Sequence, residues 1–264
     1  MKSSTSPASS ASTRLERDIA RIEIALPDPN RELAQDKEFF LVRRPAGWRE
    51  VRMHDYPAIF AIPGLYEKVV YNLFECRSPE VIAEMVAQAW DELGQPRDRA
   101  RVLDLGAGNG CVAEALAAIG AENFTGIDLH PEAAAAAERD RPGLYREFLV
   151  GDLLALPPQL EARWANLEVD LLTCVAALGF DDIPPEVFRR ALSRVRTGGL
   201  VAFTLKRDFT KEGEESGFAA LLRSLVERGT LDVIERRTYV HRKATSGDPL
   251  HYVAWVARVK HQER

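Results

Sequence analysis

The chain has 264 residues, of which 46% are hydrophobic and 28% charged, and its formal net charge at pH 7 is −5. This length allows one generous domain, or one core with a small addition, around a hydrophobic core of useful size. No apolar run is long enough to span a membrane, and the start of the chain lacks the basic-then-apolar order of a secretory signal. A net negative charge argues against a large nucleic-acid interface. We therefore expect neither a membrane nor a nucleic-acid partner.

The first part of the chain is irregular. Residues 1–14 are rich in serine and poor in acids, which favours a disordered tail over an organellar transit peptide. Residues 15–77 form an N-terminal extension that is charged at its start and rich in aromatic residues from 48 to 74. We expect the aromatic segment to be a lid and residues 78–264 to be the main domain.

The main domain begins with a helix over residues 78–94, for which Ser78 is the expected N-cap and Pro79 the first helical residue. Short apolar runs then alternate with helical segments. The expected strands cover residues 101–105, 124–128, 146–150, 169–175 and 200–205. The expected helices between and after them cover 111–119, a segment from 131, 184–196 and 218–228. This order predicts βαβ units, and therefore a parallel sheet with helices on both faces.

The end of the chain has a different pattern. Two long strand-like segments, residues 231–244 and 250–259, are joined by Ser246-Gly247-Asp248-Pro249. This turn sequence predicts a β-hairpin, so the last two strands should be antiparallel to each other. The sequence thus indicates five parallel strands that are closed by a hairpin.

A glycine-rich turn, Gly106-Ala107-Gly108-Asn109-Gly110, follows the first predicted strand of the main domain. Glycines at such a turn let the backbone approach a ligand and adopt conformations that a side chain would forbid. The nicotinamide fingerprint places its third glycine three residues after the second, whereas here the third comes two residues after. The turn alone is also compatible with a simple tight connection.

Three acidic residues lie at or near the ends of successive strands. Asp104 precedes the glycine turn, where a carboxylate suits a cationic group such as the ammonium of an amino acid and would be poorly placed beside a pyrophosphate. Asp128 ends the second strand, where open α/β sheets place an acid that binds ribose hydroxyls. Asp152 follows the third strand and is suited to accept a hydrogen bond from an adenine amino group. Together they predict a site for an adenosine-containing cofactor.

Four segments resemble the ordered motifs of class I S-adenosylmethionine-dependent methyltransferases, of the small-molecule type found in methyltransferase domains 11 and 25. They are residues 102–110, Gly126-Ile127-Asp128-Leu129, Gly151-Asp152-Leu153-Leu154 and Gly198-Gly199-Leu200. The resemblance extends over about residues 80–260. It implies a Rossmann-like, seven-stranded, mostly parallel sheet with a reversed final strand. It also implies S-adenosylmethionine as the cofactor, with Asp104 and the glycine loop near its methionine part, Asp128 at the ribose, and Asp152 and Leu153 at the adenine. Leu129 is a further expected cofactor-binding residue.

The segment after the fourth strand bears on the substrate. Enzymes that methylate the exocyclic amines of bases carry Asn/Asp-Pro-Pro-Tyr there, whereas this chain has Val175-Ala176-Ala177-Leu178-Gly179. Asp182-Ile183-Pro184-Pro185 lacks the aromatic residue, and we interpret Asp182 as a helix cap. This excludes a nucleobase amino-methylase. We expect Val175 at the cofactor and Leu178 at the substrate.

Other candidates for the substrate region are Tyr66 and Tyr71 of the lid, Lys206 after the fifth strand, and His241, the one candidate for a general base. Packing of the lid on the core explains the two tyrosines equally simply, and a solvated edge cluster is the simpler interpretation of His241. The five histidines show no metal-ligand spacing, and three scattered cysteines allow neither a disulfide framework nor a paired-cysteine metal site. We therefore expect no metal and a cytoplasmic location.

The leading hypothesis is a methyltransferase that acts on an O, N or C atom of a small molecule. A basic stripe that includes Lys206 and Lys243 would instead favour a protein or tRNA substrate. A nicotinamide-dependent oxidoreductase is disfavoured by the glycine spacing and by Asp104. The fourth alternative is a non-catalytic module that binds the cofactor. The presence of the glycine loop and of all three acidic residues argues against it.

Overall fold

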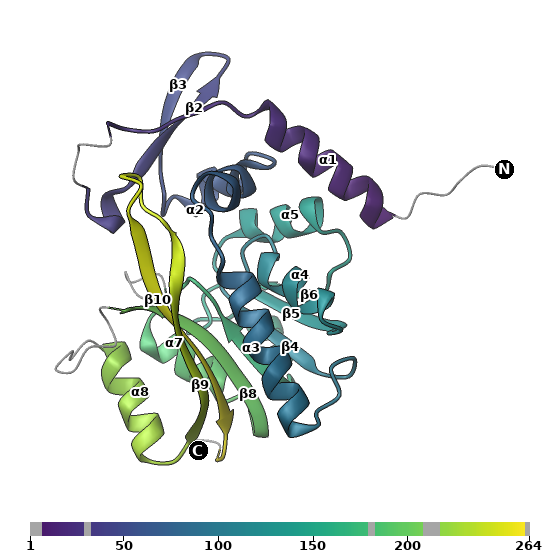
Figure 1. The fold of residues 1–264 in the computed structure, drawn as a ribbon. Helices are drawn as coiled ribbons and strands as arrows, with labels where there is room; N and C mark the ends of the chain where they lie inside the picture. Colours follow the sequence, from purple (N-terminus) through teal and green to yellow (C-terminus); the bar gives the residue numbers. More distant parts are fainter. Residues whose placement is uncertain (1–6, 29–32, 179–182, 208–216, 262–264) are drawn as a thin grey trace.

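The computed structural model describes residues 7–28, 33–178, 183–207 and 217–261, and its strands form two sheets (Figure 1). The larger sheet has seven strands in the order β6-β5-β4-β7-β8-β10-β9. Its strands are β4 (Arg101–Leu105), β5 (Asn123–Asp128), β6 (Tyr145–Val150), β7 (Val169–Cys174), β8 (Val195–Lys206), β9 (Leu231–Lys243) and β10 (Pro249–Val259). β4 to β8 pair in parallel, and β10 is antiparallel to both of its neighbours, β8 and β9. The predicted α/β fold with a C-terminal hairpin is confirmed.

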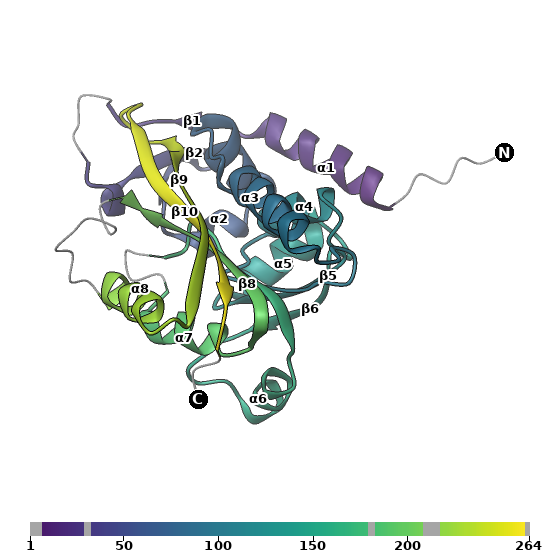
Figure 2. The same cartoon turned by 60° about the horizontal axis from the view of Figure 1, so that its bottom comes forward.

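Helices cover both faces of this sheet. One face is packed against α3 (Ser78–Leu93) and α4 (Cys111–Ala118), the other against α6 (Pro158–Ala165), α7 (Pro185–Leu192) and α8 (Gly217–Glu227) (Figures 1 and 2). Neighbouring strand residues alternate between the two layers. In β4, for example, Val102 packs in the α3 layer and Leu103 in the opposite one. Because both faces of the sheet are buried, its strands have continuous apolar runs, as the sequence indicated.

The N-terminal segment contains more regular structure than we predicted. Helix α1 (Pro7–Arg21) begins inside the segment 1–14, so the prediction of a disordered tail is wrong from residue 7 onward. Ile19 of this helix lies against Gly64, and α1 packs beside α5 (Pro131–Asp140). These contacts partly cover one side of α1, and they involve residues far apart in the sequence.

After α1 the extension forms a small antiparallel sheet in the order β1-β2-β3 and three short helices. The elements are β1 (Ile24–Ala25), η1 (Gln35–Lys37), β2 (Phe39–Arg44), β3 (Gly47–Arg52), α2 (Tyr56–Phe60) and the π-helix η2 (Glu67–Leu73). The extension has its own apolar cluster, which includes Phe40, Leu65 and Phe74.

A buried ion pair joins this small sheet to the tip of the C-terminal hairpin. Arg242 of β9 donates a hydrogen bond of 2.5 Å to Oε2 of Glu38, and the Thr245 amide donates to Oε1 at 2.6 Å. The side chains of Arg242 and Glu38 are 5% and 1% exposed. Figure 1 shows β9 and β10 reaching up to the β2–β3 hairpin. The N-terminal extension is therefore anchored to the far edge of the main sheet.

Two predicted helix boundaries are corrected. Arg77, not Ser78, occupies the N-cap of α3, because the Ser78 hydroxyl is buried and hydrogen-bonded to β9. Helix α7 ends at Leu192, four residues before the predicted end, because β8 already begins at Val195. Asp182, the predicted cap of α7, lies outside the described residues. Among the described helices, none is long and apolar enough to cross a membrane.

Candidate functional site

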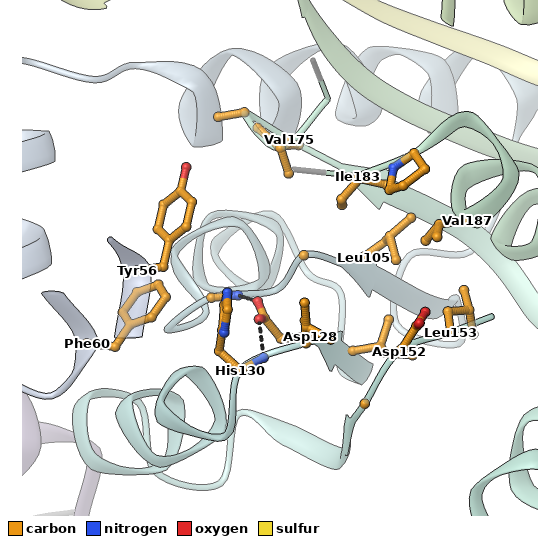
Figure 3. Close-up of a pocket in the computed structure, with 18 of the residues that line it drawn as sticks. Tyr56, Phe60, Leu105, Asp128, His130, Asp152, Leu153, Val175, Ile183 and Val187 are labelled. Atoms are coloured by element: carbon orange, nitrogen blue, oxygen red, sulfur yellow. Dashed lines mark hydrogen bonds between the residues drawn. The ribbon is translucent and has the colours of Figure 1, made fainter. Parts of the chain in front are cut away.

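A cavity of about 350 Å³ opens at the carboxyl ends of the parallel strands, and we call it the cleft (Figure 3). Its walls combine the ends of β4, β5 and β6 with the turn after β7, the start of α7 and the lid segment. The lining residues include Tyr56, Phe60, Tyr66, Gly106, Gly108, Asp128, Leu129, His130, Asp152, Leu153, Val175, Ile183 and Val187. Ligands of open α/β sheets bind at this edge of the sheet.

The glycine turn forms one wall of the cleft. Gly106, Gly108 and Gly110 have φ angles of 70°, 54° and 92°, in the left-handed region that favours glycine. A Cβ on Gly108 would stand 3.1 Å from the ring of Phe60. The missing side chains therefore let the lid and the loop approach each other at the mouth of the cleft.

Asp128 holds the loop in this shape. Its Oδ2 accepts a hydrogen bond of 2.9 Å from the Gly108 amide, and its Oδ1 accepts one of 3.0 Å from the His130 amide (Figure 3). Burial raises the pKa of Asp128, while these amides favour its ionised form. Each carboxylate oxygen keeps a second lone pair, which remains available to a ligand hydroxyl in the cleft.

Asp152 and Leu153 form the opposite end of the cleft (Figure 3). Asp152 is exposed, and its Oδ1 accepts a hydrogen bond from the Leu154 amide at 2.9 Å. Leu153 is buried, whereas Leu129 is 58% exposed. This end combines one carboxylate with apolar walls, a suitable environment for a flat ring that carries an amino group.

Asp104 is buried beneath the loop. Its Oδ2 accepts a hydrogen bond from Tyr145 Oη and its Oδ1 one from Thr173 Oγ1, both at 2.8 Å. It is not among the residues that line the cleft. Burial raises its pKa to about 6, although both hydroxyls favour the ionised form. A contact between Asp104 and a ligand cation stays a prediction.

Asp104 should make folding stability depend on pH. Between about pH 4 and pH 6 the folded protein keeps a proton at this site that an unfolded chain, with a pKa of 3.8, has lost, so stability falls as pH rises through this window. The full effect is about 3 kcal/mol at neutral pH. We expect Asp104→Asn to match the parent near pH 4 and to be more stable above pH 6, as measured by urea unfolding. The exposed Asp98→Asn is the control, and an equal difference at both pH values would contradict the prediction.

The turn after β7 is strained. Ala176 has a φ of 56°, which is costly for a residue with a Cβ, and its amide donates a hydrogen bond of 2.8 Å to Thr204 Oγ1. Val175 and Ala176 both line the cleft. This hydrogen bond holds the turn in a conformation that projects its backbone toward the ligand space.

A second, smaller cavity of about 80 Å³ lies behind the glycine loop, and we call it the inner chamber. It shares six wall residues with the cleft: Tyr56, Tyr66, Gly106, Gly108, Val175 and Ala176. Its other walls include Gln35, Met53, Val70, Tyr71, Cys76, Ser78 and His241. The two cavities therefore adjoin along the loop, between the lid and the hairpin.

His241 is buried in the wall of the inner chamber. Its Nδ1 lies 2.7 Å from Ser78 Oγ, which lies 2.6 Å from Tyr239 Oη. The ring packs on Tyr252 with a centroid distance of 4.1 Å. Burial, and after it the nearby Arg242, lowers the pKa of His241 to about 3. His241 is thus a neutral imidazole and not part of a solvated basic cluster.

Several predicted site residues lie elsewhere. Leu178 is buried in the core with Phe188, because the chain turns inward after β7. Lys206 lies at the end of β8 opposite Tyr252 and is not among the lining residues of the cleft or the inner chamber. A Cβ on Gly110 would lie against the side chains of Tyr145 and Arg141, and Gly110 is not among the lining residues of the cleft. Ala107 and Asn109 border the inner chamber and not the cleft.

Asn109 belongs to a buried polar cluster that the sequence did not reveal. Its Nδ2 donates a hydrogen bond of 2.5 Å to Glu67 of the lid, and Arg141 donates one of 3.0 Å to the same Glu67 oxygen. Arg141 also donates to the Asn109 carbonyl at 3.1 Å. These contacts join η2, the glycine loop and the end of α5. They combine residues up to 74 positions apart, which a local motif cannot show.

The lid contributes Tyr56, Phe60 and Tyr66 to the cleft, and the loop after β5 contributes His130. Of these, only Tyr66 was a predicted site residue. The aromatic richness of residues 48–74 was the signal for Tyr56 and Phe60, whereas His130 lies outside that segment. Tyr71 lies in η2 and borders the inner chamber.

Part of the chain is similar to a known family of domains. Residues 102–199 match the family model of a methyltransferase domain. The match covers less than half of the chain, and over these residues the chain is similar to methyltransferase domains. A similar fold occurs in an S-adenosylmethionine-dependent methyltransferase from Clostridium acetobutylicum, with a TM-score of 0.51, 14% identity and coverage of 75% of this chain and 97% of that one. An O-methyltransferase family protein from Burkholderia thailandensis has a TM-score of 0.50 at 16% identity, over 79% of this chain and 60% of that one.

Two relatives are ubiquinone biosynthesis O-methyltransferases. The protein from Azoarcus sp. is 32% identical over 133 residues, which cover 50% of this chain and 55% of the relative. The protein from Aromatoleum aromaticum is 34% identical over 137 residues, which cover 51% of this chain and 56% of the relative. These matches therefore span little more than half of the length of the relatives.

Proposed function

We propose that this chain is an S-adenosylmethionine-dependent methyltransferase that acts on a small-molecule acceptor. The observation that carries the proposal is the arrangement around the cleft: a left-handed glycine loop, Asp128 and Asp152 stand at the ends of three neighbouring parallel strands. The similarity to O-methyltransferases supports a small acceptor over a protein or a tRNA.

The chemistry of the cleft fits the proposed cofactor. Asp128 would accept hydrogen bonds from the ribose hydroxyls, and Asp152 one from the adenine amino group beside Leu153. Two carboxylates in one cleft disfavour a pyrophosphate, which weighs against a nicotinamide cofactor. Asp104 would stabilise the ammonium of the methionine part from beneath the loop.

The protein's contribution to catalysis would be mainly to position the acceptor and exclude water. The cofactor supplies an activated methyl group when it is bound, so proximity and orientation account for much of the rate. Tyr56 and Phe60 project from the lid segment over the cleft (Figure 3). We propose that residues 15–77 act as this lid beside a domain of residues 78–264, in the cytoplasm.

Calorimetry tests the identity of the cofactor. We expect S-adenosylhomocysteine, the product form of the cofactor, to bind the full chain, and NAD to give no binding heat. Binding of NAD without any response to S-adenosylhomocysteine would contradict the proposal and favour an oxidoreductase.

A further inference from the structure

The inner chamber adjoins the cleft along the glycine loop, and its walls beyond the residues of that loop and Val175 take no part in the cofactor assignments. It lies where the lid, the glycine loop and the C-terminal hairpin meet. We propose that the inner chamber binds the methyl acceptor, a neutral planar molecule with a ring hydroxyl, and that His241 receives the proton of this hydroxyl. This inference rests on the proposed methyltransferase function.

The size of the chamber limits the acceptor. A cavity of about 80 Å³ is smaller than the roughly 150 Å³ that hold a benzene ring in a protein core. It therefore admits the hydroxyl-bearing edge of one ring, and the rest of the ring extends toward the cleft past Tyr56 and Tyr66, which border both cavities. Tyr71 and Met53 add further aromatic and thioether surface, which suits a flat apolar body.

The charges of the chamber favour a neutral acceptor. Among the residues that the structure describes, no aspartate or glutamate lines it, so an ammonium group would lack a counter-ion there. The guanidinium of Arg242 is paired with Glu38, whose side chain is 1% exposed. Because this pairing neutralises the charge of Arg242, the guanidinium does not favour a methyl acceptor that carries a carboxylate. A hydroxyl enters without a charge and needs only a hydrogen-bond acceptor.

His241 provides that acceptor. Its Nδ1 is engaged by Ser78 Oγ at 2.7 Å, so Nε2 is the ring nitrogen left for a ligand. Because burial disfavours an imidazolium, the ring should pass a proton on as it receives one. A chain of two hydroxyl groups begins at Nδ1. Ser78 Oγ lies next to Nδ1, and Tyr239 Oη lies 2.6 Å from Ser78 Oγ on a partly exposed residue.

A lone pair of the acceptor oxygen forms the new O–CH₃ bond, and the pair of the broken S–CH₃ bond remains on the sulfur of S-adenosylhomocysteine. The hydroxyl proton moves to Nε2 of His241, the Nδ1 proton moves to Ser78, and one proton leaves through Tyr239 to water. The products are a methyl ether, S-adenosylhomocysteine and one released proton.

Two acceptors that differ in acidity test the role of His241. Catechol keeps its hydroxyl protons at weakly alkaline pH, whereas 4-nitrocatechol is ionised and needs no base. We expect His241→Gln to slow methylation of catechol by about 100-fold and that of 4-nitrocatechol much less. Tyr239→Phe and Ser78→Ala should change the ratio of the two rates in the same direction, while His251→Gln, also on the hairpin, should not change it. An equal loss for both acceptors would overturn the role of His241.

Binding measurements separate this inference from the proposed function. We expect S-adenosylhomocysteine to bind all variants as it binds the parent, and catechol to bind the parent–S-adenosylhomocysteine complex. Val70→Phe, which fills the chamber without touching the cleft, should abolish the binding of catechol but not the binding of S-adenosylhomocysteine. If S-adenosylhomocysteine fails to bind the parent, the proposed function fails. If it binds but catechol gives neither heat nor methyl ether, or tyramine is methylated on nitrogen instead, the assignment of the chamber is wrong.

Discussion

Replacing Asp128 by alanine should weaken the binding of S-adenosylhomocysteine by about 100-fold. Hydrogen bonds to a charged group contribute about 1.5–3 kcal/mol each, and a factor of ten in affinity corresponds to about 1.4 kcal/mol. The substitution removes the proposed acceptor of the ribose hydroxyls and also frees the amides of Gly108 and His130. Calorimetric titration of the full chain measures the change.

The control for this variant is Asp98→Ala, which removes an exposed carboxylate whose side chain is 62% accessible. It should bind S-adenosylhomocysteine as the parent does. Asp128→Asn retains one oxygen for a backbone amide, so we expect an intermediate loss. An unchanged dissociation constant for Asp128→Ala would refute the ribose assignment.

Replacing Arg141 by methionine should destabilise the fold by about 3–5 kcal/mol, the usual cost of leaving one partner of a buried ion pair alone. The side chains of Arg141 and Glu67 are 7% and 8% exposed. Oε2 of Glu67 is buried and has no hydrogen-bond partner. Loss of Arg141 would therefore leave a carboxylate with only Asn109 as a donor. Urea unfolding measures the effect.

A double-mutant cycle sharpens this prediction. Glu67→Gln in the Arg141→Met background should restore part of the lost stability, because a neutral amide costs less to bury than an unpaired carboxylate. Arg146→Met changes an exposed arginine on β6 and should alter stability by less than about 0.5 kcal/mol. A loss below about 1 kcal/mol for Arg141→Met would show that the pair does not hold the lid on the loop.

The main sheet was predictable because its signals are local. The predicted starts and ends of β4 to β7 agree with the structure within one residue, since each strand is an apolar run bounded by a turn. The left-handed glycine loop and Gly94, the C-cap of α3 with a φ of 62°, also follow from residue type alone. The small N-terminal sheet was not predicted, because β1 has only two residues and β3, with the sequence GWREVR, has no apolar run.

The cleft was predicted in part. Asp128 and Asp152 line it, because an acid at the end of a parallel strand reaches the ligand edge of the sheet whatever surrounds it. Leu178 does not line it, because an apolar residue after a strand is equally suited to the core, and packing against Phe188 decides its position. Ser78 has the residue type of an N-cap but serves His241 instead, across 163 residues of the chain.

The sequence by itself determined the α/β architecture, the glycine loop and the acids beside it, since each depends on the chemistry of a few adjacent residues. Only the tertiary structure decided the electrostatic state of the site. Asp104 and His241 are ordinary titratable residues in the sequence, and both acquire shifted pKa values because distant segments bury them. Their partners, Thr173 and Ser78, lie 69 and 163 residues away. Desolvation is a property of the folded surroundings, and no local pattern encodes it.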